Sequence, residues 1–436
     1  MTRSVLVGLL CCSFSLCVAG EKAIVSLRDF SKTELKSAGL ILSRSTKVHI
    51  VARGAAGSKC DSERKGKDDL FAYGWILDAD RREVVWMMDR ENTTKSRDDR
   101  IFDGELTLPR GTYEVYFTAP TFAYVSAFKN ISMNVDHRES GLFNVGIYSG
   151  TRSKGWFESL LEEFFGDDMR DDWAERSPHW GIDILVAEEA TGTISTFTPP
   201  KAFPNVVFKA TGVGENAHIR QSFTLTEPMT LLIYALGEGL GGEYELADYG
   251  WIVNSQNRSR VWEMTWRNSQ TAGGASKNLR FSGEVVLPRG TYTLYYVSDN
   301  SHSTADWNCA PPTDPLNYGI TLRAASEKEK AYFTLRNASD EGYVIVSLTR
   351  VRDNESRSEA FTLKKDAQVR IYAIGERSNQ RRLMADYGVI LDARTRTRVW
   401  TMDVERTSHA GGASKNRMID EIVTLPRGSY IVRYVT

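Results

Sequence analysis

The stretch 299–314 holds the residues best suited to binding chemistry. It includes Asp306, Trp307, Asn308 and Asp314. Calcium prefers oxygen ligands, so Asp306 and Asp314 are candidate calcium ligands. A tryptophan beside acidic and amide groups is also suited to holding the face of a sugar or a protein ligand. A third interpretation is structural, in which Trp307 enters the core and prolines stiffen a long crossover loop.

A second candidate is a glycine-rich loop that occurs twice. Residues 272–278 have the sequence Ala-Gly-Gly-Ala-Ser-Lys-Asn, and residues 410–416 repeat it. Paired glycines let the backbone approach another group closely, and the residues that follow offer hydrogen-bond donors. Tight packing of the loop on the neighbouring hairpin explains the motif equally well. The candidate binding residues are Ser276, Lys277, Asn278, Ser414, Lys415 and Asn416.

The sequence predicts no catalytic residues and therefore no enzyme activity. It contains no Gly-x-Ser-x-Gly, His-Glu-x-x-His or phosphate-binding glycine loop. Its six histidines are scattered singly and do not recur between repeats, which is typical of structural histidines.

Around these loops the chain repeats one pattern three times. Asp386-Tyr387-Gly388 at the third copy corresponds to Asp248-Tyr249-Gly250, 138 positions earlier, and to Tyr73-Gly74 in a first copy that carries insertions. Each copy also contains a Val-Trp pair and a Leu-Pro-Arg-Gly-x-Tyr segment. A period this long is the size of a domain rather than of a solenoid unit, so we expect three tandem domains.

Apolar residues alternate at period two within each copy, which predicts short antiparallel strands. The expected fold is all-β, with three tandem β-sandwiches of jelly-roll-like form. In the third copy a strand is predicted at 344–348, and Gly375-Glu376 is predicted to form a turn. A closing strand is expected at 179–184 and 317–322. The sequence stops before its third counterpart, so we expect either completion by a neighbour or, preferably, a fragment of a longer protein.

The repeat unit resembles the secreted bacterial β-sandwich domains of the pre-peptidase C-terminal type. The shared features are a Phe-x-Leu strand, a Tyr-Gly strand and a closing Leu-Pro-x-Gly-x-Tyr hairpin, here 361–363, 387–388 and 425–430 in the third copy. Domains of that type are non-catalytic appendages of exported proteins, so the resemblance implies a binding or spacer role. The long loop around Trp307 departs from the family pattern.

The first copy contains an insertion with an amphipathic helix predicted near 151–172. Six large apolar residues lie on one face and glutamates on the other; they are Trp156, Phe157, Leu160, Leu161, Phe164 and Phe165. Packing of this face within the chain is the first interpretation. Docking of a partner protein is the second, and membrane association the last, because the polar face is acidic.

The composition of the chain predicts a signal peptide and the boundaries of the domains. Residues 1–20 have the charged start, apolar core and small-residue exit of a signal peptide. The predicted boundaries are 21–192 for repeat 1, 193–204 for a linker, 205–323 for repeat 2, 324–340 for a linker and entry strand, and 341–436 for repeat 3. No later segment is apolar enough to span a bilayer.

Charge and cysteine content limit the partners. Lys and Arg number 55 against 56 for Asp and Glu, so nucleic acid is not an expected partner. Removal of the signal leaves Cys60 and Cys309, which allow a disulfide in an oxidising compartment but no metal cluster. We expect an exported, non-catalytic binding or spacer array at the cell surface, in the periplasm or secreted. The alternatives are a calcium-stabilised adhesion module, with calcium as the one possible cofactor, and the accessory region of an enzyme.

Overall fold

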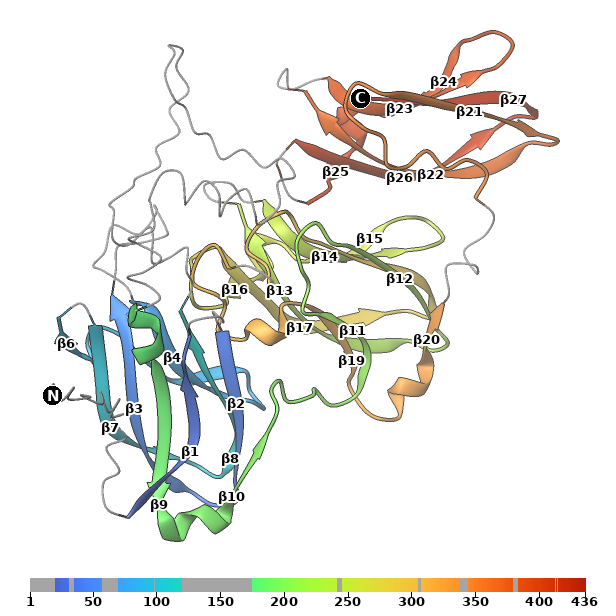
Figure 1. Ribbon diagram of the computed structural model, residues 1–436. Coiled ribbons are helices and arrows are strands. Elements are labelled where there is room, and N and C mark those ends of the chain that lie inside the picture. Colours follow the sequence, from blue (N-terminus) through green and yellow to red (C-terminus); the bar gives the residue numbers. More distant parts are fainter. Residues whose placement is uncertain are drawn as a thin grey trace, which may run out of the picture. The chain divides into compact units, whose positions relative to one another are not determined.

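The computed structural model describes residues 20–30, 35–56, 70–97, 99–119, 175–240, 245–304, 307–336, 344–378, 383–411, 413 and 415–436. Its strands pair only antiparallel within this part of the chain, which confirms the all-β prediction (Figure 1). The chain divides into two compact units. Repeat 1 lies in the first unit, which ends at Lys201, and repeats 2 and 3 lie in the second.

Repeat 1 is built from two facing layers. One has the order β1-β9-β3-β7-β6 and the other β10-β2-β8-β4-β5, and β3 and β4 join the layers by a short pairing. The strands are β1 (Glu21–Arg28), β2 (Leu35–Leu42), β3 (Thr46–Ala56), β4 (Leu70–Asp78), β5 (Glu83–Met87), β6 (Thr94–Ser96), β7 (Asp99–Leu108), β8 (Gly111–Thr118), β9 (Gly181–Ala187) and β10 (Ile194–Phe197), with the 3-10 turns η1 (Ser177–His179) and η2 (Glu188–Thr193).

Repeat 2 has the same topology, with layers β11-β19-β13-β17-β16 and β20-β12-β18-β14-β15. Its strands are β11 (Val206–Thr211), β12 (His218–Leu225), β13 (Met229–Gly239), β14 (Leu246–Asn254), β15 (Arg260–Glu263), β16 (Gln270–Thr271), β17 (Asn278–Leu287), β18 (Gly290–Val297), β19 (Gly319–Ala324) and β20 (Phe333–Arg336), with η3 (Trp266–Asn268), η4 (Pro315–Asn317) and η5 (Glu329–Tyr332).

Repeat 3 keeps the central strands. Among its described residues there is no counterpart of β11, β19 or β20. Its elements are β21 (Ser356–Leu363), β22 (Ala367–Arg377), β23 (Met384–Asp392), β24 (Arg398–Thr401), η7 (Val404–Arg406), β25 (Ser408–His409), β26 (Asn416–Leu425) and β27 (Gly428–Val435).

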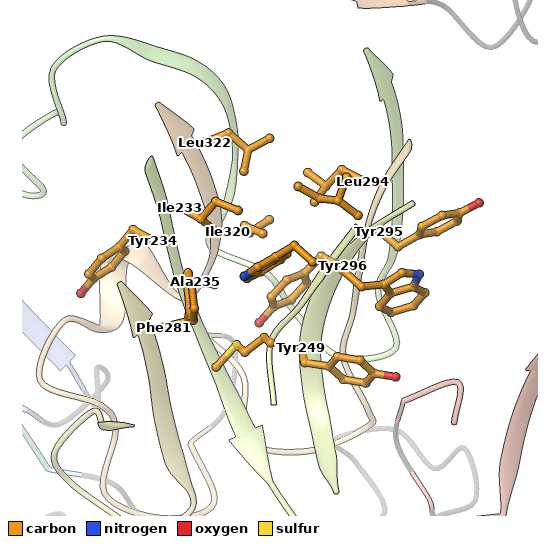
Figure 2. Packing of buried hydrophobic residues seen from close by; sticks show 14 of the residues in the cluster. Ile233, Tyr234, Ala235, Tyr249, Phe281, Leu294, Tyr295, Tyr296, Ile320 and Leu322 are labelled. Carbon is orange, nitrogen blue, oxygen red and sulfur yellow. The ribbon is translucent and has the colours of Figure 1, made fainter. Parts of the chain in front are cut away.

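The alternating pattern places one face of each strand in a shared core. In repeat 2, Ile233 and Ile320 from one layer meet Leu294 and Tyr296 from the other, and all four side chains are 1% exposed or less (Figure 2). Tyr295, the next residue along β18, points outward from its layer. Burying large apolar side chains in this way is the main source of stability for such a fold.

Equivalent landmarks occupy equivalent positions in repeats 2 and 3. Tyr249 and Tyr387 pair with Val297 and Val435 at the end of the last strand. Trp262 and Trp400 also match, since they pair with Ile252 and Ile390. The prediction of one repeated sandwich is confirmed.

Two predicted local elements are wrong. Residues 344–348 form no strand, and Val344 is 77% exposed. Their counterpart in repeat 2, β11, pairs only with β19, so without such a strand the segment has no ladder partner. Gly375-Glu376 is no turn but part of β22, and the cause is close strand approach: a Cβ at Gly375 would lie 2.1 Å from the Asp386 carbonyl oxygen.

Each segment predicted as a linker contains an edge strand of the preceding repeat. β10 pairs with β2 of repeat 1, and β20 pairs with β12 of repeat 2. The predicted helix near 151–172 and the side chain of Cys60 lie outside the described residues. Among the residues that the structure does describe, no helix is long and apolar enough to cross a membrane.

Candidate functional site

The loop around Trp307 is anchored in the core of repeat 2. Trp307 is 3% exposed and meets the ring of Tyr318 edge-on at 5.2 Å between centroids. His302 packs on it from another side at 4.9 Å. A buried indole offers no open face to a sugar, which favours the structural interpretation of this residue.

Of the two predicted calcium ligands, the structure describes Asp314 alone. Asp314 is 2% exposed, and its Oδ2 accepts a hydrogen bond from the Tyr234 hydroxyl at 2.8 Å. Asn317 Nδ2 donates to both Asp314 oxygens at 3.0 and 3.1 Å. Asp306 lies outside the described residues. Asp314 therefore helps to close the loop from within the fold.

The glycine-rich loop packs directly on the Trp307 loop. Asn278 Nδ2 donates to the carbonyl oxygens of Gly273 and Ala310, each at 2.9 Å. A Cβ at Gly274 would lie only 1.9 Å from the Pro311 carbonyl oxygen, so glycine is required for this approach. Ser276 in the same turn is half-buried.

The copy in repeat 3 is closed in a similar way. Asn416 Nδ2 donates to the Gly411 carbonyl at 2.9 Å, and Lys415 Nζ lies 2.9 Å from Glu376 Oε1. Ser414 lies outside the described residues. These contacts favour the packing interpretation of the motif, in which it closes a turn.

Beside these loops lies an acidic cluster that we define as Glu238, Asp248 and Asp299, in which Glu238 and Asp248 pair across β13 and β14. One carboxylate oxygen from each lies within 4.8 Å of the others. Lys277 Nζ is 2.7 Å from Glu238 Oε1 and donates to Asn308 Oδ1 at 2.7 Å. The predicted binding residues Lys277 and Asn308 therefore belong to this internal network.

Asp248 is held on both of its oxygens. The Asp299 backbone N–H donates to Oδ1 at 2.8 Å and the Tyr318 hydroxyl donates to Oδ2 at 2.7 Å. A further buried group, His302, lies beside the cluster with its ring nitrogens 2.9 Å from Asn308 Oδ1 and 2.5 Å from Asn278 Oδ1.

Burial controls the ionisation of the acidic cluster. It raises the pKa of Glu238 to about 7, and the Lys277 ammonium opposes this change without cancelling it. Burial also raises the pKa of Asp248 well above its ordinary value, with the neighbouring carboxylates adding to the effect. The pKa of Asp299 is raised for the same first reason. Burial thus favours the protonated forms of all three carboxyl groups.

Three carboxylates are a donor set suited to a hard cation. In this cluster the Lys277 ammonium already supplies a positive charge, and protonation removes part of the negative charge. The carboxylates can thus be stabilised by protons and lysine alone.

The acidic cluster differs between repeats, and this difference was the signal that sequence reasoning missed. Glu376, Asp386 and Lys415 recur at an offset of 138 from Glu238, Asp248 and Lys277. In repeat 1 alanines stand at the first two positions, namely Ala55 and Ala72. There the Asn278 position is Asp99, which accepts hydrogen bonds from Arg53, Arg176 and Trp180. The charged residues change together, which indicates one functional or structural unit.

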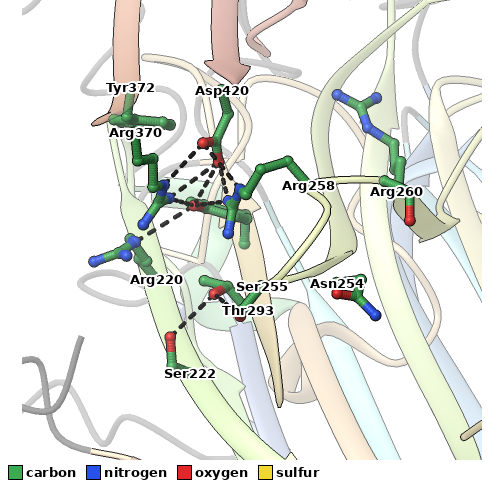
Figure 3. Close-up of polar contacts among 12 residues, drawn as sticks. Arg220, Ser222, Asn254, Ser255, Arg258, Arg260, Thr293, Arg370, Tyr372 and Asp420 are labelled. Atoms are coloured by element: carbon green, nitrogen blue, oxygen red, sulfur yellow. Dashed lines mark hydrogen bonds and ion pairs between the residues drawn. The ribbon is translucent and has the colours of Figure 1, made fainter. Parts of the chain in front are cut away.

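A second site lies on the outer face of the β12-β18 layer, and we call it the arginine pocket. Its volume is about 160 Å³. The lining consists of Ser222, Ser255, Arg258, Thr291, Thr293, Arg336 and Arg370. Figure 3 shows the arginines Arg258 and Arg370 on one side and the hydroxyl residues on the other.

Asp420 of repeat 3 ties the arginine pocket to the neighbouring repeat. Its two oxygens accept from Arg258 Nε at 3.0 Å and Nη2, and from Arg370 Nε and Nη2 at 2.9 and 3.0 Å. The Tyr295 hydroxyl accepts a hydrogen bond from Arg370 Nη2 at 3.1 Å. The Tyr295 ring stacks on the ring of Tyr372, with 6.0 Å between the centroids. Repeats 2 and 3 are thus joined by a shared carboxylate.

Comparisons with known proteins give no family. No family model matches the chain, and no curated protein sequence is significantly similar. One solved structure, described as dimeric latent PorU from Porphyromonas gingivalis, aligns with 94% of this chain at 10% identity and a TM-score of 0.15. The chain covers 32% of that structure.

Proposed function

We propose that the protein is an exported, non-catalytic array of β-sandwiches that acts as a spacer and as a binding surface for carbohydrate or protein. Asp420 carries the spacer part of this proposal most directly. It bridges Arg258 and Arg370 while its own side chain is 8% exposed, so the connection between repeats 2 and 3 is more than a covalent tether.

The polar residues of the two loops bond to other groups inside the fold, which supports a non-catalytic role. Lys277, Asn278 and Asp314 all make hydrogen bonds within the fold of repeat 2. His302, which lies beside the acidic cluster, is fully buried, and its pKa is lowered well below the ordinary value because burial disfavours its charged form. A base held in this way is poorly placed to reach a substrate.

The first 20 residues support export to the periplasm, cell surface or medium. Cys309 is disulfide-bonded, which fits an oxidising compartment. The resemblance of the strand pattern to pre-peptidase C-terminal domains points to the same kind of exported appendage.

Export is tested by expressing the full chain in a bacterial host and sequencing the N-terminus of the product. We expect the protein in the periplasm or medium, beginning close to Glu21. A product retained in the cytoplasm with Met1 or Thr2 at its N-terminus would contradict the proposal.

The calcium-stabilised alternative makes a separate prediction. A cation that binds only the folded protein raises its thermal stability by mass action. Because Lys277 and protons already stabilise the acidic cluster, we expect millimolar calcium to leave the melting temperature unchanged. Magnesium chloride at equal ionic strength is the control. A calcium-specific rise that is lost in Asp299→Asn would favour the adhesion-module alternative.

A further inference from the structure

The arginine pocket of repeat 2 has the chemistry of a site for an acidic sugar. Its lining holds three arginines, four hydroxyl residues and, in this part of the described chain, no carboxylate. Ser222 Oγ and Ser255 Oγ lie 3.0 and 3.1 Å from Thr293 Oγ1, so the hydroxyls form a connected row. Guanidinium groups bind carboxylates, and hydroxyls match the donors and acceptors of a sugar ring.

Repeat 1 shows what fills the corresponding space. There Glu114 is fully buried, and Arg82 Nη1 donates to its Oε1 and Oε2 at 3.0 and 2.9 Å. The Tyr116 hydroxyl donates to Oε2 at 2.5 Å, and the Lys201 backbone N–H donates to Oε1 at 2.6 Å. In repeat 1 this position in the fold is thus occupied by a carboxylate that an arginine, a tyrosine and a backbone N–H hold.

The arginines of the two repeats occupy the same turn. Arg258 N–H donates to the Asn254 carbonyl at 2.9 Å, as Arg82 N–H does to Asp78 at 2.8 Å. Both arginines adopt a left-handed backbone, with φ of 60° and 57°. The two side chains thus start from one geometry.

The buried glutamate of repeat 1 is replaced by a threonine in repeat 2. Glu114 pairs with Leu77 across the sheet, and the matching partner of Val253 in repeat 2 is Thr293. Replacing glutamate by the shorter, neutral threonine removes an internal carboxylate and leaves the pocket.

The arginines retain capacity for a ligand although Asp420 lies near. Arg258 and Arg370 use Nε and Nη2 on Asp420. Within the described residues, neither Nη1 group has a hydrogen-bond partner. The two guanidinium groups of Arg258 and Arg370 against the one carboxylate of Asp420 also leave a formal excess of positive charge at the arginine pocket.

We propose that the arginine pocket binds a carboxylate-bearing sugar, a hexuronate unit, with its carboxylate where repeat 1 carries that of Glu114. This inference rests on the proposed binding function and names its ligand class. The row of hydroxyls favours a sugar over an acidic peptide, because a peptide side chain would bring few groups to pair with Ser222, Ser255 and Thr293.

Isothermal titration of the chain from residue 21 to residue 436 tests the proposal. The probes are glucuronate and galacturonate, with glucose and galactose as neutral counterparts and glutamate as a carboxylate without a sugar. We expect millimolar binding of at least one uronate, with the neutral sugars and glutamate weaker by about tenfold or more. Equal binding of glutamate, or no uronate binding at millimolar concentration, would overturn the proposal.

Two variants locate the site. Thr293→Glu installs the acid of repeat 1, so it should fill the pocket and weaken uronate binding by about tenfold or more. Arg336→Gln removes a charge at the pocket border and should weaken binding while leaving the far-ultraviolet circular dichroism unchanged. Arg396→Ala, at the same turn of repeat 3, is the matched control and should bind normally.

The variants also separate this inference from the wider function. If uronates bind equally to Thr293→Glu and Arg336→Gln, the arginine pocket is excluded while a binding array remains. If ligands of every class fail in titration, both ideas fall and the spacer role is left.

Discussion

At the scale of single residues, the acidic cluster shows how burial sets chemistry. Glu238 is 6% exposed and keeps Oε2 without a hydrogen-bond partner among the described residues, while Oε1 faces Lys277. A buried carboxylate without full pairing favours its protonated form. The resulting pKa change couples protonation to folding.

This coupling predicts a pH dependence of stability. The folded pKa of Glu238 is about 7 against an ordinary value of 4.5, so the folded state holds a proton that the unfolded chain releases between these values. The stabilisation is therefore complete below pH 4.5 and is lost as the pH rises through 7. A pKa change of this size corresponds to about 3 kcal/mol.

Glu238→Gln tests the pH dependence because glutamine mimics the protonated acid. We expect the variant to lose much less stability than the unmodified protein between pH 5 and pH 8, measured by urea unfolding with tryptophan fluorescence. Glu376→Gln in repeat 3 is the control, since that side chain is 32% exposed. An identical pH profile for Glu238→Gln and the unmodified protein would rule out this explanation.

At the scale of elements, close crossing of strands explains a glycine common to all three repeats. A Cβ at Gly237 would lie 2.0 Å from the Asp248 carbonyl oxygen, and at Gly54 it would lie 1.9 Å from that of Ala72. These positions are where the two layers of each sandwich join. The glycine thus permits the crossover that defines the fold.

Gly237→Ala should therefore destabilise repeat 2. The added methyl group would meet a backbone carbonyl, which cannot move aside as a flexible side chain can. We therefore expect the free energy of unfolding to fall by about 2–3 kcal/mol, measured by thermal or urea unfolding. Gly214→Ala is the control in the same repeat, because no atom lies within 4 Å of its added Cβ. Equal stability of the two variants would show that the strands can separate at little cost.

Most strands could be predicted from the sequence because apolar and polar residues alternate within each strand and because repeats 2 and 3 align without gaps. The segment at 344–348 could not, since its apolar alternation resembles β11 but a strand also needs a partner. The acidic cluster was missed for a related reason. Glu238 and Asp248 face each other where β13 and β14 pair, and the Asp299 backbone N–H bonds to Asp248, so the three meet only through strand pairing that no local pattern shows.

At the scale of the whole molecule, the same turn arginine finds three different environments. In repeat 1 Arg82 pairs with Glu114 of its own sandwich, whereas in repeat 2 Arg258 pairs with Asp420 of repeat 3. Arg396 of repeat 3 is exposed and makes no side-chain hydrogen bond or ion pair within the described residues. A small change in one strand thus converts an internal ion pair into a connection between repeats.

Asp420 is the residue on which this connection depends. Its removal would leave the guanidinium of Arg258, whose side chain is 4% exposed, without a carboxylate. Loss of one partner from a buried ion pair costs roughly 3–5 kcal/mol. Asp420→Asn should therefore weaken the contact of repeats 2 and 3 without unfolding either sandwich, because the change lies at their junction.

Small-angle X-ray scattering and calorimetry measure this effect together. We expect Asp420→Asn to broaden the distribution of interatomic distances and to separate the melting of repeats 2 and 3 into distinct transitions. Glu405→Gln, an exposed acidic site on the same repeat, should change neither measurement. If the Asp420→Asn scattering profile equals that of the unmodified protein, Asp420 does not hold the repeats together, and the spacer role must depend on other contacts.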